Sequence, residues 1–506
     1  MTEHDRATGT DRSEPHHLNR MKTNRRSFLK SSALAATAIA LPAASWARAA
    51  GANGDIRVAV IGFNGRGKDH IEGFRKLKGV RLVALCDVDK KVLAAQAQKL
   101  KDEGNEVQTF TDVRKLLASG EIDAVSIATP NHWHALMAIW ACQQGKDVYV
   151  EKPVSHNVWE GRQIVHAARR YNRIVQTGTQ SRSNPGLQEA IAWLHSGGLG
   201  EVKLARGLCY KPRQSIGRAA GPQTIPDSID YDLWCGPAAK TEMLRKNLHY
   251  DWHWVFETGN GDVGNQGIHQ MDIARWALRQ NALSPRIISV GGRLGYHDDG
   301  NTPNTQFVLH DYPDAPMIFE VRGLPRGKEF QSAALWSKNM PDYKGAGIGV
   351  VIDCAGGSMV IPSYDSATAY DEKGNLMRQF KGGGDHYANF IKAVRSRNRG
   401  ELNADIEQGH LSSALCHTGN ISHRLGQTDD VDDIRDHLAF SPAAKETFDR
   451  MVGHLAANGV DLDRSPLTLG AMLDMDPTTE RFIGNDRADA LLRRGYRYPF
   501  VVPEKV

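Results

Sequence analysis

A glycine-rich segment at residues 62–67 is the first stretch whose residue types could do chemistry. It follows an apolar run at residues 56–61 and precedes a helical pattern. Small residues at such a turn let the backbone approach a pyrophosphate, and the helix that begins there offers free N–H groups and a positive dipole end. Asn64 replaces the middle glycine of the usual G-x-G-x-x-G pattern, but asparagine tolerates left-handed backbone angles. The segment predicts a dinucleotide phosphate turn formed by Gly62, Asn64, Gly65, Arg66 and Gly67.

A carboxylate stands where such a site needs one. Asp87 ends the next apolar run, 20 residues after Gly67, a spacing that suits contact with the adenosine ribose hydroxyls. Its charge would repel a 2′-phosphate, so we expect NAD rather than NADP. A solvated carboxylate at a strand end is the alternative interpretation, and the glycine-rich turn favours binding.

The elements that must position these residues alternate regularly. Strand-like apolar runs occupy residues 56–61, 82–86, 124–128, 147–150 and 174–177, with helical stretches such as 68–77 and 92–100 between them. This alternation predicts an α/β chain that begins with a Rossmann-type, doubly wound parallel sheet over residues 55–177.

The pattern changes after residue 178. Strand-like runs at residues 202–210, 287–291, 305–309 and 317–322 include several with no helix between them. They predict an α+β domain over residues 178–425 with an open, largely antiparallel sheet. We also expect a loop at residues 214–230, helices at 386–397 and 406–425, and an extension over residues 426–506 that packs on the domains.

Further motifs make the chain resemble the Gfo/Idh/MocA oxidoreductase family. They are T-P-N-H-W-H at residues 129–134, E-K-P at 151–153, G-T-Q at 178–180, D-L-W-C-G-P at 232–237 and G-D-V-G-N-Q-G-I-H-Q-M-D at 261–272. The family pairs a Rossmann domain with an open-sheet substrate domain and typically oxidises or reduces sugars and cyclitols. The resemblance covers residues 55–425, and the last two of these segments look like the exported, long-tailed branch of the family. The resemblance also implies a homo-oligomer. It also implies cofactor contacts for Thr129, Pro130, Asn131, His132, His134, Glu151 and Lys152.

The resemblance implies roles for two residues in the reaction. Lys152 matches the family lysine that contacts the nicotinamide region and the substrate hydroxyl, where an ammonium stabilises a developing alkoxide. His269 matches the histidine that accepts or relays the hydroxyl proton, a role suited to a side chain titrating near neutrality. The alternatives are an exposed strand-end lysine and a core histidine with satisfied hydrogen bonds.

One position departs from many dehydrogenases of the family. Four residues before His269, where they carry an aspartate, this sequence has Asn265, whose amide cannot accept a proton but can orient a hydroxyl or an imidazole. Asp262, one helical turn earlier, is the candidate for the missing carboxylate. The departure argues against a simple copy of the family's Lys-Asp-His mechanism.

Aromatic and polar side chains near these motifs are candidates for sugar contacts, because carbohydrate faces stack on indole rings and hydroxyls favour charged or amide partners. The candidates are Gln180, Tyr210, Lys211, Arg213, Trp252 and Trp254. Tryptophans at alternate positions are equally common in cores, and that alternative stays open. We predict no metal site, because the H-x-H of His132 and His134 lies where cofactor packing is expected. The six cysteines are widely spaced, without a C-x-x-C pair, and are expected to be buried small apolar residues, with disulfides as the alternative.

The N-terminal 50 residues have the composition of an export signal. Paired arginines at residues 25 and 26 precede an apolar run at 31–44 and an A-x-A at 47–49, which resembles a twin-arginine signal cleaved near Ala49. A membrane anchor is the alternative, but this run is too short to span a bilayer comfortably. We therefore expect a periplasmic or secreted protein that uses the twin-arginine machinery. Because no free nicotinamide pool is expected outside the cytoplasm, the NAD should be tightly bound.

Charge argues against nucleic acid as a partner. The net charge is +5, but residues 1–50 hold 8 Lys and Arg against 4 Asp and Glu, which leaves 55 against 54 in the rest of the chain. A nucleic-acid-binding face would need clustered basic residues.

Three functions follow, in order of preference. The first is an exported sugar, sugar-derivative or cyclitol oxidoreductase that transfers a hydride between a carbinol carbon and bound NAD. The second is an NAD-dependent glycosidase or lyase that oxidises C3 transiently and eliminates the glycosidic oxygen. The third is a noncatalytic binding protein of the same fold, suggested by Asn265.

Overall fold

A parallel β-sheet opens the computed structural model, which describes residues 54–506; the predicted export signal lies outside these residues. Among the described residues this sheet has six strands in the order β3-β2-β1-β4-β5-β6. The order reverses between β1 and β4, where ligands bind in doubly wound sheets. The strands are β1 (Ile56–Ile61), β2 (Val80–Cys86), β3 (Gln108–Phe110), β4 (Ala124–Ile127), β5 (Asp147–Val150) and β6 (Val175–Thr177).

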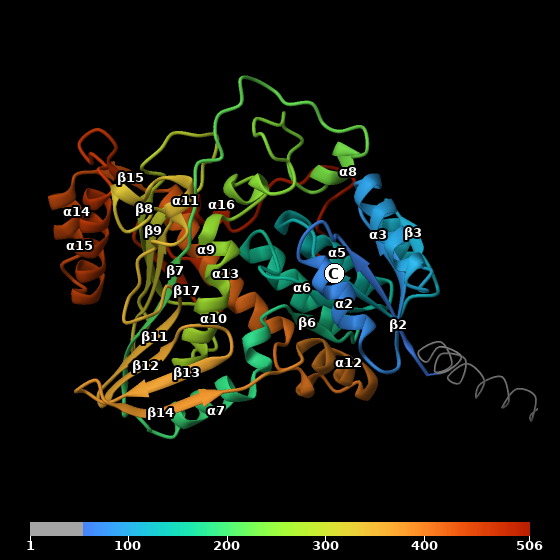
Figure 1. Cartoon of the computed structure of the whole chain (residues 1–506), viewed down its shortest axis with the longest axis horizontal. Helices are drawn as coiled ribbons and strands as arrows, with labels where there is room; N and C mark the ends of the chain where they lie inside the picture. Colours follow the sequence, from blue (N-terminus) through green and yellow to red (C-terminus); the bar gives the residue numbers. More distant parts are fainter. Residues whose placement is uncertain (1–53) are drawn as a thin grey trace, which may run out of the picture. The chain divides into compact units, whose positions relative to one another are not determined.

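Helices alternate with these strands, as the sequence predicts. Figure 1 shows them in blue to teal around the sheet. They are α2 (Gly67–Arg75), α3 (Lys90–Asp102), α4 (Val113–Leu117), α5 (Asn131–Gln143) and α6 (Val158–Arg170).

The second sheet is mixed, and within the described range it has twelve strands. Its neighbouring strands are antiparallel except for the parallel pair β7 and β10. The predicted fold class is therefore confirmed. The strands are β7 (Val202–Tyr210), β8 (Arg286–Gly292), β9 (Thr305–His310), β10 (Met317–Arg322), β11 (Ile348–Cys354), β12 (Gly357–Ile361), β13 (Ser366–Tyr370), β14 (Leu376–Lys381), β15 (Gln427–Asp429), β16 (Leu467–Leu469), β17 (Leu473–Asp476) and β18 (Arg481–Phe482).

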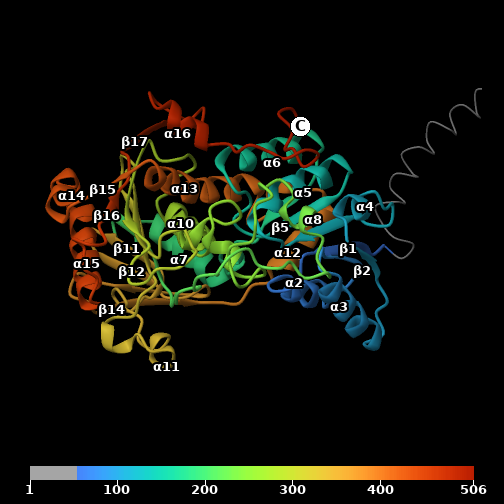
Figure 2. The same cartoon turned by 90° about the horizontal axis from the view of Figure 1, so that it is seen from above.

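The helices of the later part of the chain cover this sheet or return to the first one. They are α7 (Pro185–His195), α8 (Tyr231–Cys235), α9 (Gly261–Asn265), α10 (Gly267–Ala277), α11 (Ala333–Trp336), α12 (His386–Ser396), α13 (Ile406–Arg424), α14 (Val431–His437), α15 (Pro442–Ala457) and α16 (Asp486–Leu491). Both views place α12 beside α2, far from its sequence neighbours in the second sheet (Figures 1 and 2). Residues 214–230 contain neither helix nor strand, as expected.

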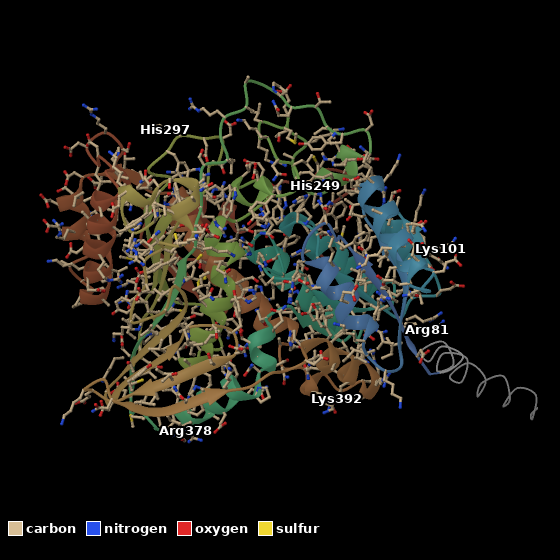
Figure 3. All side chains as sticks on the ribbon, viewed as in Figure 1. Arg81, Lys101, His249, His297, Arg378 and Lys392 are labelled. Carbon is tan, nitrogen blue, oxygen red and sulfur yellow. The ribbon has the colours of Figure 1, made fainter. Side chains whose placement is uncertain are left out.

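The central strands of both sheets are apolar because they are covered on two faces, whereas edge strands such as β3 and β14 are largely exposed. In β1, Ala59 and Ile61 pack with the helices on one side, while Val58 packs with Phe74 of α2 and Phe390 of α12 on the other. Long charged side chains such as those of Lys101 and Lys392 lie at the surface instead (Figure 3).

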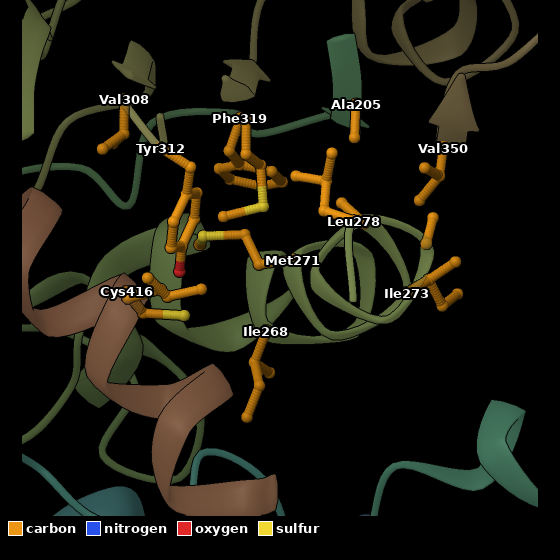
Figure 4. Close-up of a cluster of buried hydrophobic side chains, with 14 of the residues drawn as sticks. Ala205, Ile268, Met271, Ile273, Leu278, Val308, Tyr312, Phe319, Val350 and Cys416 are labelled. Atoms are coloured by element: carbon orange, nitrogen blue, oxygen red, sulfur yellow. The ribbon is translucent and has the colours of Figure 1, made fainter. Parts of the chain in front are cut away.

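The second sheet alternates in the same way. Phe319 of β10 packs against Met271 of α10, in the cluster drawn in Figure 4. Ile318, the preceding residue, points to the opposite face and packs with Phe448 of α15. This period of two lets one strand serve two helical layers.

The C-terminal extension is part of the second sheet as well as a cover for it. Residues of β16 pair with β8, Leu469 opposite Val290, and residues of β17 also pair with β8. Near the chain end, Phe500 lies edge-on to Trp133 of α5, with ring centroids 5.4 Å apart.

No helix among residues 54–506 is long and apolar enough to cross a membrane. All six cysteines are free, and five of them are buried.

Candidate cofactor and substrate site

The glycine-rich turn after β1 combines tight packing with open space. Gly62 has a φ of +75°, and a Cβ there would lie 2.8 Å from the Cγ2 atom of Thr129. A Cβ on Gly67 would lie 2.0 Å from the carbonyl oxygen of Gly62. By contrast, a Cβ on Gly65 would meet no atom within 4 Å. The turn therefore needs glycine at both ends, and its middle leaves room for a phosphate to approach the backbone.

Asp87 is fixed at the end of β2 by backbone donors. The N–H of Phe63 donates to Oδ2 at 3.1 Å, and the N–H of Asp89 donates to Oδ1 at 3.0 Å. Burial raises the pKa of Asp87, and these two hydrogen bonds oppose the shift. Each carboxylate oxygen keeps a further lone pair that can accept from a ribose hydroxyl.

A cavity of about 510 Å³ connects these residues with the E-K-P turn and with α9. Its volume lies in the range of cofactor sites. The five strands that lead to it, β1 to β5, end at one edge of the parallel sheet, which is why distant sequence segments meet there. Its lining includes all of the predicted cofactor residues except Gly67 and His132: Gly62, Asn64, Gly65, Arg66, Asp87, Thr129, Pro130, Asn131, His134, Glu151 and Lys152.

The two histidines of the T-P-N-H-W-H segment hold backbone in place. His134 lies within hydrogen-bonding distance of two carbonyl oxygens, with Nδ1 2.6 Å from Pro153 and Nε2 2.7 Å from Thr129. It thereby joins the two turns that bound the cavity. His132 contacts the carbonyl oxygens of Thr258 and Trp234 at 3.3 and 2.9 Å, outside the cavity lining.

Glu151 is a buried carboxylate surrounded by donors. Its Oε1 accepts from Arg66 at 3.2 Å and lies 3.0 Å from Nε2 of His70, while Oε2 accepts from the backbone N–H of Lys152 at 3.1 Å. Burial alone would raise the pKa of Glu151, but the His70 hydrogen bond and the nearby cations hold it well below the usual range. Gly178 leaves the necessary space, since a Cβ there would lie 2.9 Å from this carboxylate. His70 was not predicted from the sequence, because its position in a helix carries no local signal.

Lys152 joins the two sheets at the end of the cavity. Its Nζ donates to the backbone oxygen of Asn265 at 2.7 Å. Burial lowers the pKa of Lys152, the charge of Glu151 opposes this, and the charges of Lys211 and Arg66 add to it. The amine is thus a fixed donor whose proton is less strongly held than in a free lysine.

His269 lies at the start of α10, outside the lining of the cavity, and has an unused ring nitrogen. Its Nδ1 is buried without a hydrogen-bond partner, and its ring lies edge-on to Tyr364 at 5.1 Å. Burial, together with the charge of Lys152, lowers the pKa of His269 to about 3. This shift runs against the expected titration near neutrality, and its causes are the burial of the ring and the nearby cation. The neutral imidazole can still accept a proton.

Asp262 is placed differently from the expected carboxylate. It is buried and forms two hydrogen bonds with Arg213, both of 2.7 Å. The Arg213 guanidinium in turn lies 4.7 Å from the ring centroid of Trp254. None of these three residues lines the cavity. Asp262 is therefore engaged in an ion pair outside the cavity lining, and the structure does not place it where the missing carboxylate was expected.

The other predicted substrate residues divide into two groups. Trp252 lines the cavity, and Gln180 donates to Glu151 at 3.3 Å. Lys211 donates to the side chain of Gln266 at 3.4 Å and is close enough to lower the pKa of Lys152. Tyr210 belongs elsewhere, since its hydroxyl donates to the buried Glu320 at 2.8 Å in an ion network beneath α15.

Residues 228–253, which we call the strap, close one side of the cavity. Lining residues from the strap are Leu233, Trp234, Asn247, His249, Tyr250, Trp252 and His253. Nε2 of His249, labelled in Figure 3, lies 3.0 Å from Asp89, and the backbone N–H of Lys90 donates to Ser228 at 2.9 Å. The strap is also tied to the C-terminal extension, because Arg497 donates to the Asp232 carboxylate at 2.6 Å. The sequence did not predict the strap, since it lacks regular secondary structure over most of its length.

A doubly wound sheet with a phosphate turn, joined to an open mixed sheet, defines a two-domain nucleotide-binding protein. Residues 56–179 match the family model described as the oxidoreductase family, NAD-binding Rossmann fold, and residues 201–320 match the model of the C-terminal alpha/beta domain. The chain therefore carries both domains of the Gfo/Idh/MocA oxidoreductase family, and its first domain has the NAD-binding fold.

Curated relatives are similar over a limited segment. A glycosyl hydrolase family 109 protein of Shewanella pealeana is 37% identical over 175 residues, which are 30% of this chain and 38% of that protein. A protein of the same name from Solibacter usitatus is 34% identical over 160 residues, covering 29% and 36%. The matches thus span less than two fifths of these relatives.

Solved structures share the fold at low identity. The WlbA dehydrogenase of Bordetella pertussis, in complex with NADH and UDP-GlcNAcA, has a TM-score of 0.51 at 20% identity, covering 71% of this chain and 94% of that one. Levoglucosan dehydrogenase, in complex with NADH and levoglucosan, has a TM-score of 0.52 at 17% identity, covering 72% and 95%.

Proposed function

We propose that this protein is an exported oxidoreductase that acts on a hydroxyl-bearing carbon of a sugar or sugar derivative with a tightly bound NAD. The observation that carries the proposal is the continuous cavity from the glycine-rich turn and Asp87 to Lys152 and Asn265. A nucleotide held by its phosphates and ribose at one end has its reactive end near the lysine. When bound, NAD supplies the hydride acceptor.

The chain's own residues suit the proton chemistry of an alcohol oxidation. The Lys152 ammonium, positioned by the Asn265 carbonyl, would stabilise negative charge on the substrate oxygen as it loses its proton. The resemblance assigns the acceptance of that proton to His269; its Nδ1 is buried and its ring lies outside the cavity lining, so the proton would reach it by a relay. Asn265 lines the cavity and can orient a hydroxyl through its side-chain amide. Arg66 and His70 keep Glu151 charged beside Lys152, which opposes deprotonation of the amine.

Tight cofactor binding is supported by the strap. It covers the cavity beside Asp87 and is fastened to α3 through Asp89 and to the C-terminal extension through Arg497. We expect these contacts to slow the dissociation of a nucleotide that lies beneath the strap. An exported enzyme needs this property if the cytoplasm is its source of NAD.

The deciding experiment uses protein purified without added nucleotide. Denaturation should release NAD near one equivalent per chain, identified by mass and absorbance. Incubation with a panel of sugars before denaturation should convert this NAD to NADH with one sugar class. Protein that contains no nucleotide and does not rebind NAD tightly would refute the proposal. Processing and export are tested separately, by N-terminal sequencing of protein recovered from the periplasm.

A second function, NAD-dependent glycoside cleavage through transient oxidation at C3, is supported by the names of the curated relatives. The same groups would serve it, because oxidation of a hydroxyl precedes elimination and reduction follows. Release of an aglycone from aryl glycosides without net accumulation of NADH would favour cleavage. Accumulation of NADH with free sugars would favour the oxidoreductase.

A further inference from the structure

A second, smaller cavity lies at the N-terminus of α6. It has a volume of about 50 Å³, enough for a group of a few atoms. Asn157 forms its floor and caps α6, with Oδ1 accepting from the N–H of Glu160 at 2.9 Å. His417 of α13, Asn260 before α9 and Arg494 of the C-terminal extension complete much of the wall.

Four buried nitrogen atoms of residues that line this cavity have no hydrogen-bond partner. The amide and guanidinium nitrogens are donors, and the imidazole nitrogens are donors when they carry a hydrogen. The four atoms are Nδ2 of Asn157, Nε of Arg494, Nε2 of His156 and Nδ1 of His417. Asn157 and His417 are 5% and 3% exposed, so water outside the protein does not satisfy them. Leaving several buried donors unpaired costs free energy, which an acceptor in the cavity would recover.

Arg494 determines the tautomer of His156, that is, which ring nitrogen carries the hydrogen. Arg494 donates through NH1 to Nδ1 of His156 at 3.2 Å. Because a guanidinium cannot accept, Nδ1 is the acceptor and a neutral His156 ring carries its hydrogen on Nε2. Burial, followed by the charge of Arg494, lowers the pKa of His156 well below its usual range, so the neutral ring is the stable form. Nε2 is therefore a donor with no partner at ordinary hydrogen-bond distance, although the backbone of Phe256 acts on this ring and partly opposes the lowering of its pKa.

The cavity also has an excess of positive charge. Three arginines line the cavity, and in the part of the chain that the structure describes Arg493 is paired with Glu504, whereas Arg424 and Arg494 form no close ion pair with a carboxylate. The charge of Glu257 acts on Arg424 from a longer distance. The buried carboxylate of Glu160 is nearby and accepts from the His156 N–H at 2.9 Å and the Tyr496 hydroxyl at 3.0 Å. The charge of Arg494 and the side chain of Asn157 also act on it and oppose the rise that burial causes in its pKa, so Glu160 balances part of the positive charge. The N-terminus of α6 adds a partial positive charge. Donors without acceptors, next to two arginines and a helix N-terminus, are complementary to an anion.

We propose that this cavity is a binding site for a small inorganic oxyanion of the phosphate or sulfate type. Its oxygens would accept from Asn157, His156 and Arg494, with Arg424 at the entrance. The site is separate from the cofactor cavity but shares a wall with it, because Asn260 accepts from Asn131 at 2.9 Å and donates to the His156 carbonyl at 3.1 Å.

The test replaces one donor without removing the helix cap. Asn157→Asp keeps the oxygen that accepts from Glu160, and aspartate caps helices as well as asparagine does. Its second oxygen places a negative charge where the anion would lie. The matched control is Asn485→Asp, which makes the same change at the cap of α16, outside this cavity.

The measurement is thermal unfolding of the full protein in phosphate, sulfate, chloride or acetate at constant ionic strength. We expect phosphate and sulfate to raise the melting temperature saturably, by several degrees, in the wild type and in Asn485→Asp. Asn157→Asp should melt at or above the wild-type temperature without phosphate and should lose the phosphate response. Arg424→Gln, a change at a partly exposed side chain, should weaken apparent phosphate binding by about tenfold.

Several results would overturn the proposal. Equal effects of phosphate and chloride would show a general salt effect, and a larger effect of acetate would assign the site to carboxylates. If phosphate raises the melting temperature of a normally folded Asn157→Asp variant, or of Arg424→Gln, as much as that of the wild type, the cavity holds only water.

Discussion

Replacing Lys152 with methionine tests the role assigned to the amine. Methionine keeps most of the aliphatic stem but removes the charge and the donor that reaches the Asn265 carbonyl at 2.7 Å. An ammonium about 3 Å from an alkoxide is worth about 5–6 kcal/mol at an effective dielectric constant of about 20, and under 2 kcal/mol in water. Removing a positioned donor of this kind in other enzymes costs about 3–4 kcal/mol. We therefore expect kcat/KM of Lys152→Met to fall about 10²- to 10³-fold.

The assay must separate chemistry from cofactor binding. Nucleotide released from the denatured variant should stay within about twofold of wild type, because the phosphate turn and Asp87 are untouched. The matched control is Lys101→Met, at an exposed position on α3, which should keep both activity and NAD content. Wild-type turnover in Lys152→Met would refute the reasoning, and a parallel loss of NAD would assign the lysine to cofactor retention instead.

Three further predictions concern the turn, the base and the strap. Gly65→Ala should fold normally but lose NAD at least about tenfold more readily, which the nucleotide content of the purified protein measures. Gly67→Ala should lower the free energy of unfolding by about 1–3 kcal/mol, because its Cβ would lie 2.0 Å from a backbone oxygen, and denaturant unfolding measures this loss. Because the pKa of His269 is lowered to about 3, its proton-accepting form is present throughout the neutral range. In the wild type, kcat/KM should then not fall as the pH is lowered through about 6.5. A fall there that is present in the wild type and absent in His269→Gln would contradict this prediction. Arg497→Ala removes the 2.6 Å contact with Asp232 and should speed the loss of NAD during dialysis severalfold. If the variant retains NAD as well as the wild type, the strap does not control the dissociation of NAD.

Most of the first domain could be predicted from local patterns. The apolar run at β1 and the glycines after it identify a strand and a phosphate turn, since both depend on residues close in sequence. Asp87 could be placed by spacing alone, because a strand and a helix have nearly fixed lengths in such a unit. The second sheet was predictable as a class but not in its strand order, which depends on pairings between distant segments.

The extension after α13 shows the same limit. Its sequence favours helices and short strands, and we expected it to pack on the domains. Only the tertiary structure shows that β16 joins β8 and that Arg497 fastens the strap. Neither contact has a local signal, because each partner lies more than 170 residues away in the sequence.

The sequence by itself therefore determined the two-domain class, the phosphate turn, Asp87 and the candidates Lys152 and His269, because these follow from short motifs and from the periodicity of strands and helices. The tertiary structure decided what each polar side chain faces. In the structure, Asp262 pairs with Arg213 and Tyr210 bonds to Glu320. His269 is buried near a lysine, and the donors around Asn157 have no acceptors. The physical reason is that charge state and hydrogen bonding depend on burial and on neighbours from distant segments, which a one-dimensional pattern does not contain.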